Sequence, residues 1–141
     1  MRRAFMIVAT GVTLGCMGYA AAQTGKSVTV TGNVVDAACF MIHPPAATLP
    51  SHKDCGDACV SRGVPLAIIN EADGQMYFAA DGNKQLGVFH HKRVKAMGTA
   101  VRKTEPLELK MAVGDSNEMS VSVKGGYNVL MIESLTEAPR K

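Results

Sequence analysis

Three cysteines and one histidine are the residues of this sequence whose types and spacing best suit ligand chemistry. His52, Cys55 and Cys59 lie together in the segment SHKDCGDACVSRGVP, and Cys39 lies upstream of it. Thiolate and imidazole groups are common protein ligands of zinc and copper ions. We therefore treat these four side chains as a candidate Cys3His metal site, with Zn or Cu as its cofactor.

The segment that holds the histidine and two of the cysteines is predicted to form a short helix over residues 51–65. Ser51 can act as the N-cap, and Asp54 carries a negative charge that suits the positive end of a helix. Gly63 can adopt the left-handed conformation that ends a helix, and Pro65 prevents the helix from resuming. Both ends of the helix are therefore marked in the sequence.

Helical spacing places the histidine and both cysteines on one face. His52, Cys55 and Cys59 stand at positions i, i+3 and i+7. Side chains at i and i+4 start about 5–6 Å apart, so two thiolates can reach one ion at about 2.3 Å each. The positive field at the helix start is expected to lower the pKa of the thiols. Cys39 would complete the site from the preceding loop.

Residues 1–22 are predicted to be a secretory signal peptide, which leaves residues 23–141 as a single domain. Two arginines follow the initial methionine, an apolar run comes next, and three alanines form a small-residue cleavage site. The apolar run is too short and too rich in glycine to span a bilayer. We expect the protein to be periplasmic or secreted.

The leader also has features of two other export signals. Its arginine pair resembles a twin-arginine motif, but the polar residue expected before the pair is missing, so the Sec route is preferred. Thr13 stands where a lipoprotein box has an aliphatic residue, which argues against a lipid anchor at Cys16. Removal of the leader leaves Cys39, Cys55 and Cys59.

An odd number of thiols in an oxidising compartment leaves two alternatives to the metal site. A disulfide could join Cys39 to Cys55 or to Cys59; the two helix cysteines are too far apart to bridge each other without distortion. The protein would then be a non-catalytic binding module whose barrel face or loops contact a protein partner. In a thiol-redox protein, by contrast, Cys55 or Cys59 would be the attacking thiolate.

The rest of the chain is predicted to be mainly β, with six or seven short strands and this one helix. β-branched and apolar residues alternate with polar ones, and dipeptides such as Asp73-Gly74 mark the turns. Gly32 is expected to form a bulge or sharp bend in the first strand. The prolines of residues 37–50 are expected to keep that segment extended. The expected strands are residues 27–36, 66–70, 76–80, 93–103, 107–113, 119–123 and 128–135, with turns that include residues 114–117.

The strand pattern V-x-V-x-G-x-V at residues 28–34 resembles that of the OB-fold, a small closed barrel. Residues 28–135 also resemble a group of small exported bacterial domains with this strand end and a cysteine segment H-K-x-C-x-x-x-C-x-x-x-G-x-P. The resemblance implies the OB-like fold and export, and it implies no particular activity. The matching residues are Gly32, Val34, Val35, Asp36, Cys39, His52, Lys53, Cys55, Cys59, Gly63 and Pro65.

Composition argues against several classes of function. The formal net charge of +3 falls to +1 without the two leader arginines, and only five aromatic residues lie outside the leader. Single-stranded nucleic acid needs a basic groove with stacking aromatics, so nucleic-acid binding is not expected. The sequence contains no G-x-S-x-G elbow, no phosphate-binding glycine loop and no H-E-x-x-H motif, so no enzymatic activity is expected.

The other histidines, aspartates and methionines that could be ligands are interpreted as structural or surface residues. His90 and His91 are adjacent, so on a strand they would point to opposite faces, and both are expected at the surface. His43, beside a proline, is expected to be a solvated loop residue. Asp54 and Asp57 are interpreted as charges that favour the start of the helix. The scattered methionines outside the leader are interpreted as core residues.

Overall fold

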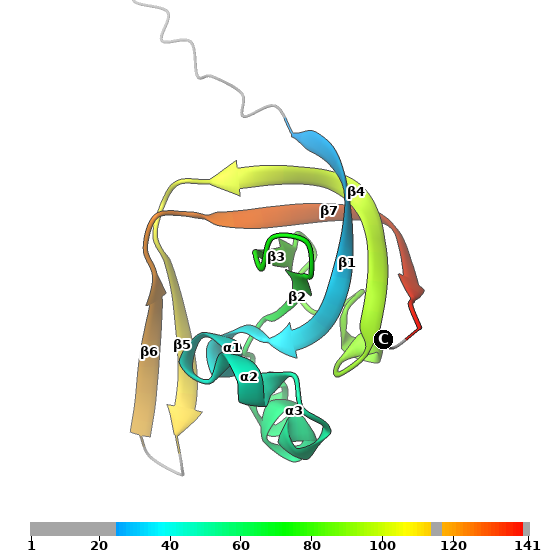
Figure 1. Cartoon of the computed structure of the whole chain (residues 1–141). Coiled ribbons are helices and arrows are strands. Elements are labelled where there is room, and N and C mark those ends of the chain that lie inside the picture. Colours follow the sequence, from blue (N-terminus) through cyan, green and yellow to red (C-terminus); the bar gives the residue numbers. More distant parts are fainter. Residues whose placement is uncertain (1–24, 114–116, 140–141) are drawn as a thin grey trace, which may run out of the picture.

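A five-stranded barrel forms the centre of the computed structural model, which describes residues 25–113 and 117–139 (Figure 1). Its neighbouring strands are antiparallel except for β3 and β7, which run parallel. The predicted fold, a mainly β chain with an OB-like barrel, is confirmed. The barrel closes in the order β1 (Lys26–Asp36), β2 (Leu66–Asn70), β3 (Met76–Ala79), β7 (Tyr127–Glu137) and β4 (Arg93–Lys103).

The inside of the barrel is filled by the apolar positions of the alternating strands. Successive side chains of a strand point to opposite faces, so every second residue can be buried. Val30 and Val34 of β1 illustrate this alternation, and both are fully buried. The main core consists of Val30, Val34, Leu66, Ile68, Ala79, Leu86, Val94, Ala96 and Leu130.

Two glycines allow the long strands to curl around this core. β1 pairs with β4 through residues 26–33 and with β2 through residues 32–36, so Gly32 belongs to both ladders. A Cβ atom on Gly32 would collide with the backbone of Ile69, and one on Gly98 would collide with that of Met131. The shift in strand register lies between Met97 and Gly98 of β4. Both glycines therefore serve close backbone approach.

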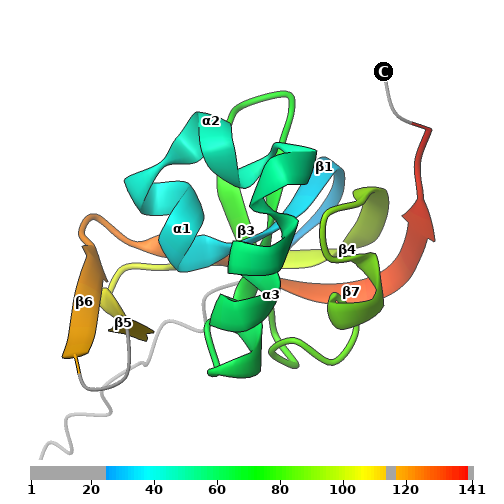
Figure 2. The ribbon, with the colours of Figure 1, turned by 90° about the horizontal axis from the view of Figure 1, so that it is seen from below.

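The connection between β1 and β2 contains four helical segments, which lie together on one side of the barrel (Figure 2). The prediction that residues 37–50 form an extended loop is wrong. The Asp36 carboxylate caps α1 by accepting a hydrogen bond from the backbone N–H of Cys39 at 2.9 Å. Pro44 begins α2. Proline lacks a backbone N–H, but the N–H of the first residue of a helix has no acceptor within the helix, so no hydrogen bond is lost. The segments are α1 (Ala37–Ile42), α2 (Pro44–Ala47), the 3-10 turn η1 (Pro50–His52) and α3 (Lys53–Ser61).

A two-stranded hairpin, β5 (Leu107–Val113) and β6 (Asn117–Val123), projects from the barrel beside α1 (Figure 1). Val121 of β6 packs against the buried cluster of Ala38, Cys39, Ala47, Cys59 and Val64. The helices and the hairpin thus share a second small core outside the barrel. Most of the predicted turn at residues 114–117, the predicted signal peptide and Cys16 lie outside the described residues.

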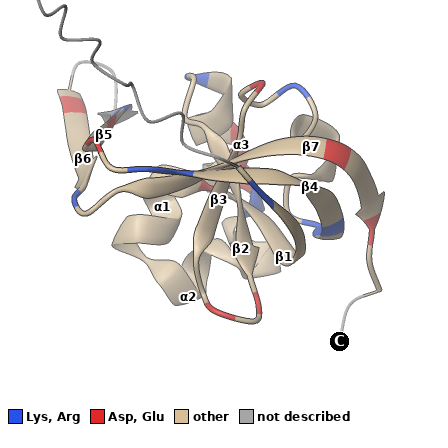
Figure 3. Ribbon diagram, turned by 90° about the horizontal axis from the view of Figure 1, so that it is seen from above, with Lys and Arg blue, Asp and Glu red and all other residues tan. Residues whose placement is uncertain are grey.

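Charged residues of both signs are interspersed along the ribbon (Figure 3). Arg93, at the start of β4, donates two hydrogen bonds to the carboxylate of Glu71, at 2.6 and 2.9 Å. Lys92 contacts Glu137 at the end of β7 at 3.1 Å. These pairs join the β2–β3 turn and the end of the last strand to the start of β4.

The segment between β3 and β4 contains a short 3-10 turn, η2 (Gly87–Phe89). Among the helices of residues 25–113 and 117–139, none combines the length and apolar character needed to cross a membrane.

Candidate metal centre

α3 carries two of the predicted ligands and lies within the predicted helical segment. It covers Lys53–Ser61 and follows the 3-10 turn η1. Ser51 lies inside this turn, so its predicted role as the N-cap is wrong. Gly63 has a φ of 92°, the left-handed conformation predicted for the end of the helix. The backbone N–H of Val64 then donates to the carbonyl of Cys59 at 3.2 Å and fixes the exit of the chain.

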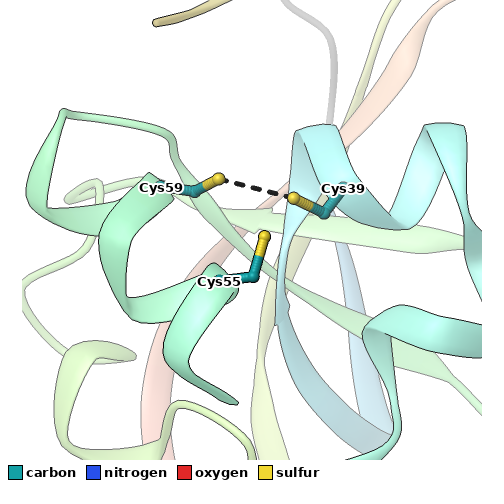
Figure 4. A group of neighbouring side chains, drawn as sticks. All are labelled: Cys39, Cys55 and Cys59. Atoms are coloured by element: carbon teal, nitrogen blue, oxygen red, sulfur yellow. Dashed lines mark hydrogen bonds between the residues drawn. The ribbon is translucent and has the colours of Figure 1, made fainter. Parts of the chain in front are cut away.

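The three thiols of the described residues converge between α1 and α3 (Figure 4). Their Sγ atoms all lie within 4.8 Å of one another, and those of Cys39 and Cys59 are 3.4 Å apart. Cys39 and Cys59 are only 5% and 8% exposed, whereas Cys55 is exposed. The group is thus closed on the side of the helix packing and open to solvent at Cys55.

These separations suit ligands of one metal ion. With metal–sulfur bonds of about 2.3 Å in tetrahedral geometry, neighbouring sulfur atoms are about 3.8 Å apart. All three cysteines are free thiols, and neither predicted pairing of Cys39, with Cys55 or with Cys59, is formed. Only small side-chain rotations are needed to place three thiolates around one ion.

Burial dominates the acidity of the two inner thiols. It raises the pKa of Cys39, and a hydrogen bond with Asp36 raises that pKa further. It also raises the pKa of Cys59. The expectation that the helix field lowers these pKa values is therefore wrong, because desolvation outweighs it. Both thiols are protonated at neutral pH, so a metal ion must displace their protons.

His52 lies beside the thiol group and contacts Asp36. Its Nε2 is 3.3 Å from the Asp36 carboxylate, which is fully buried. Ligand atoms of His52, Asp36 and Cys39 lie within 4.8 Å of one another, so Cys39 belongs to this group and to the thiol group. His52 is thus adjacent to the predicted site on the side of Cys39, at the junction between η1 and α3.

Asp36 is a site residue to which sequence reasoning gave no role, although it belongs to the motif that carries the resemblance. It accepts hydrogen bonds on both oxygens, one from the backbone of Cys39 and one in its contact with His52. A signal was present, because an aspartate directly after a buried apolar strand and before Ala-Ala-Cys is a typical helix N-cap. Asp36 therefore connects the end of β1 to α1 through Cys39 and to η1 through His52.

A second polar group is formed by Asp57 of α3 with His90 and His91, which lie in the segment between η2 and β4. The prediction that the two histidines point to opposite faces at the surface is wrong. Their side chains are only 7% and 13% exposed, and both contact Oδ1 of Asp57, at 2.9 and 3.3 Å. The residues form a turn in place of a strand, and His91 has a φ of 63°. His43, in contrast, is exposed as predicted.

The charge of Asp57 is strongly stabilised. Lys53 donates to its second carboxylate oxygen at 2.6 Å, and this bond, together with the contact to His90, lowers the pKa of Asp57 to about 2. Burial lowers the pKa of His90 despite the nearby carboxylate. Asp57 is therefore more than a charge at the start of a helix, because it joins α3 to the segment before β4.

Comparison of the chain with models of protein families, with curated proteins and with solved structures finds no match in any of the three. The function must therefore be argued from the residues of the site.

Proposed function

We propose that this protein is an exported metal-binding protein in which the thiolates of Cys39, Cys55 and Cys59 hold one Zn²⁺ or Cu⁺ ion. The observation that carries the proposal is the convergence of three Sγ atoms, from two helices, within 4.8 Å of one another. Thiolates select these thiophilic ions over harder cations. The predicted signal peptide supports export, and the proposal needs no catalytic step.

His52 is the proposed fourth ligand, or the residue that orients the site through Asp36. A tetrahedral zinc ion would use an imidazole as its fourth ligand, whereas Cu⁺ is satisfied by three thiolates. In the structure His52 lies next to Cys39, and its ring contacts the fully buried carboxylate of Asp36. Loss of His52 should therefore weaken the binding of Zn²⁺ more than the binding of Cu⁺.

The exposure of Cys55 suggests how the ion reaches the site. Cys39 and Cys59 are buried among apolar side chains of the helices and the hairpin, so solvent reaches the ion only from the Cys55 side. A ligand on a partner protein could replace this one thiolate while the two inner thiolates still hold the ion. This arrangement suits an accessory protein that receives or delivers a metal ion.

A structural disulfide is the competing candidate, because Cys39 and Cys59 already lie 3.4 Å apart. It would stabilise the helices against the barrel by about 3 kcal/mol and leave Cys55 as an exposed thiol. A thiol-redox role receives less support, since burial raises the pKa of Cys39 and Cys59 and disfavours the attacking thiolate.

Titration of the reduced, metal-free protein with Co²⁺ tests the proposal. Thiolate-to-cobalt charge-transfer absorption that saturates at one ion for the three-cysteine site is expected, and Zn²⁺ should bleach it. The variants Cys39→Ser, Cys55→Ser and Cys59→Ser should each weaken this band, while the exposed control His43→Ala should not. Absence of a thiolate band in the folded, reduced protein would disprove the proposal.

A further inference from the structure

The group formed by Asp57, His90 and His91 lies apart from the thiols on the same helix. Asp57 follows Cys55 by two positions, so their side chains leave α3 about 160° apart around its axis. Nδ1 of His90, Nε2 of His91 and Oδ1 of Asp57 converge, and ligand atoms of the three residues lie within 4.8 Å of one another. This group uses none of the residues of the proposed thiol site.

We propose that Asp57, His90 and His91 form a second metal site, which binds a divalent transition-metal ion such as Zn²⁺. Two imidazoles and one carboxylate are ligands of borderline hardness, which suit Zn²⁺ and Cu²⁺ better than they suit Cu⁺. The second site would thus accept Zn²⁺ but disfavour Cu⁺, which the thiol site can hold. The proposal does not depend on the thiol site.

The distances from the Asp57 carboxylate to the two ring nitrogens are close to those around a tetrahedral ion. With metal–ligand bonds of about 2.0–2.1 Å, neighbouring ligand atoms are about 3.3 Å apart. Oδ1 of Asp57 is 2.9 Å from the nitrogen of His90 and 3.3 Å from that of His91. In the metal-free protein each contact can be a hydrogen bond in which the ring N–H of the histidine donates to Asp57. In the metal-bound protein the ion would take the place of both hydrogens, and each neutral ring would carry its proton on the other ring nitrogen.

The backbone holds the two rings in this arrangement before any ion binds. His91 adopts a left-handed backbone conformation that is uncommon in residues other than glycine, and its backbone N–H donates to the carbonyl of Val34 of β1 at 3.0 Å. The ring centroids of His90 and His91 are 3.5 Å apart, closer than the roughly 5 Å that two imidazoles on one tetrahedral ion require, so the rings must spread when the ion binds. A Cβ atom on Gly56 would lie 2.8 Å from the His91 ring and 3.2 Å from the His90 ring. The absence of a side chain at position 56 therefore lets both rings reach Asp57.

The proposed site borders a pocket that leaves room for a further ligand. His90 and His91 line this pocket, whose volume is about 490 Å³. Lys53, Lys92, Arg93 and Glu71 also line it, and each of the three cations is paired with a carboxylate. A tetrahedral ion held by three protein ligands keeps one position open. Water is expected to fill it from the pocket.

A variant without thiols isolates the second site. In a Cys39→Ser, Cys55→Ser, Cys59→Ser background, calorimetry should find one Zn²⁺ per chain, and bound Co²⁺ should show tetrahedral ligand-field bands without thiolate charge transfer. The further changes His90→Ala and His91→Ala should weaken binding at least 100-fold. Addition of His43→Ala to the same background is the matched control and should leave binding unchanged. Zinc binding that survives loss of both histidines would overturn the proposal.

If the thiol-free variant does not fold, the wild-type protein gives the same answer. It should bind two Co²⁺ ions, and the His90→Ala, His91→Ala variant should bind one ion with its thiolate band intact. A wild-type protein that binds a single, thiolate-coordinated ion would disprove the second site and leave the thiol site standing. A single ion without a thiolate band, lost on removal of the histidines, would support the second site and disprove the proposed function.

Discussion

The Sγ atoms of Cys39 and Cys59 lie 3.4 Å apart although twenty positions separate them in the chain. This distance is longer than a disulfide bond of about 2.05 Å and close to the spacing of two thiolates on one ion. Two helical segments from the same β1–β2 connection bring them together. Whether the pair holds a metal ion or oxidises to a disulfide is the main question for this protein.

Single cysteine variants distinguish these outcomes by stability as well as binding. In reducing, metal-free buffer, Cys39→Ser and Cys59→Ser should lower the free energy of unfolding by about 1–3 kcal/mol, because they place hydroxyls in a buried apolar cluster. Cys55→Ser should change it by less than about 0.5 kcal/mol, because Cys55 is exposed. Zinc should stabilise the wild type against urea, and it should stabilise each of the three cysteine variants less.

A protein with a disulfide would show a different pattern of stability among the variants. Under oxidising conditions without metal, a Cys39–Cys59 disulfide would make loss of either partner cost about 3 kcal/mol while Cys55→Ser remained neutral. Stabilisation of the wild type by oxidation, together with no stabilisation by zinc, would contradict the metal-site account.

The affinity of the thiol site should rise with pH. Burial raises the pKa of Cys39 and Cys59, so each of these thiols must release a proton when metal binds. Below the thiol pKa values, each released proton increases the apparent association constant about tenfold per pH unit. Competition titrations between pH 6.5 and 7.5 should therefore show at least a 100-fold rise in affinity. A change of tenfold or less would mean that these two thiols are not both ligands.

Asp36 should stabilise the fold mainly as the cap of α1. Asp36→Ala removes the acceptor for the Cys39 N–H and leaves buried polar groups unpaired, so it should cost about 1–3 kcal/mol in urea denaturation. Asp36→Asn keeps an oxygen for this hydrogen bond and should recover part of that loss. Equal destabilisation by both variants would show that the charge, in its contact with His52, matters more than the cap.

Gly56 offers a prediction with an unusual sign. In an ordinary helix interior, replacing glycine by alanine stabilises a protein by about 1 kcal/mol. Here the new Cβ would lie 2.8 Å from the His91 ring and 3.1 Å from the Asp36 carboxylate. Gly56→Ala should therefore destabilise the metal-free protein by about 1–3 kcal/mol through overpacking. Thermal unfolding of this variant checks the sign.

Ala58→Gly, at an exposed position of the same helix, is the control for helix propensity. It should cost about 1 kcal/mol, the usual penalty for glycine in a helix. A stabilised Gly56→Ala variant would show that the rings of His90 and His91 move away easily, and would weaken the case that position 56 preorganises them.

The barrel was accessible to sequence reasoning because its strands are specified locally. The predicted strands at residues 66–70, 93–103 and 107–113 coincide with β2, β4 and β5. Alternation of β-branched and polar residues needs no tertiary information to be read. Gly32 and Gly98 likewise mark the places where strands approach too closely for a side chain.

The candidate site was only partly accessible, for identifiable reasons. Convergence of Cys55 and Cys59 follows from helical spacing, but the path of Cys39 depends on α1, which the prolines of the following segment concealed. Pro44 begins α2 in place of preventing it. His90 and His91 share one partner because His91 adopts a left-handed conformation that a tertiary hydrogen bond to Val34 holds. No local pattern in the sequence encodes that contact.

The most direct test of the central claim is a joint measurement of metal content and free thiols on protein expressed with its full sequence and purified without chelator. The account predicts at least one tightly bound zinc or copper ion per chain, with three thiols that become reactive when the protein is denatured in chelator. Protein without metal, and with only one reactive thiol per chain after denaturation, would contradict it and establish a disulfide in its place.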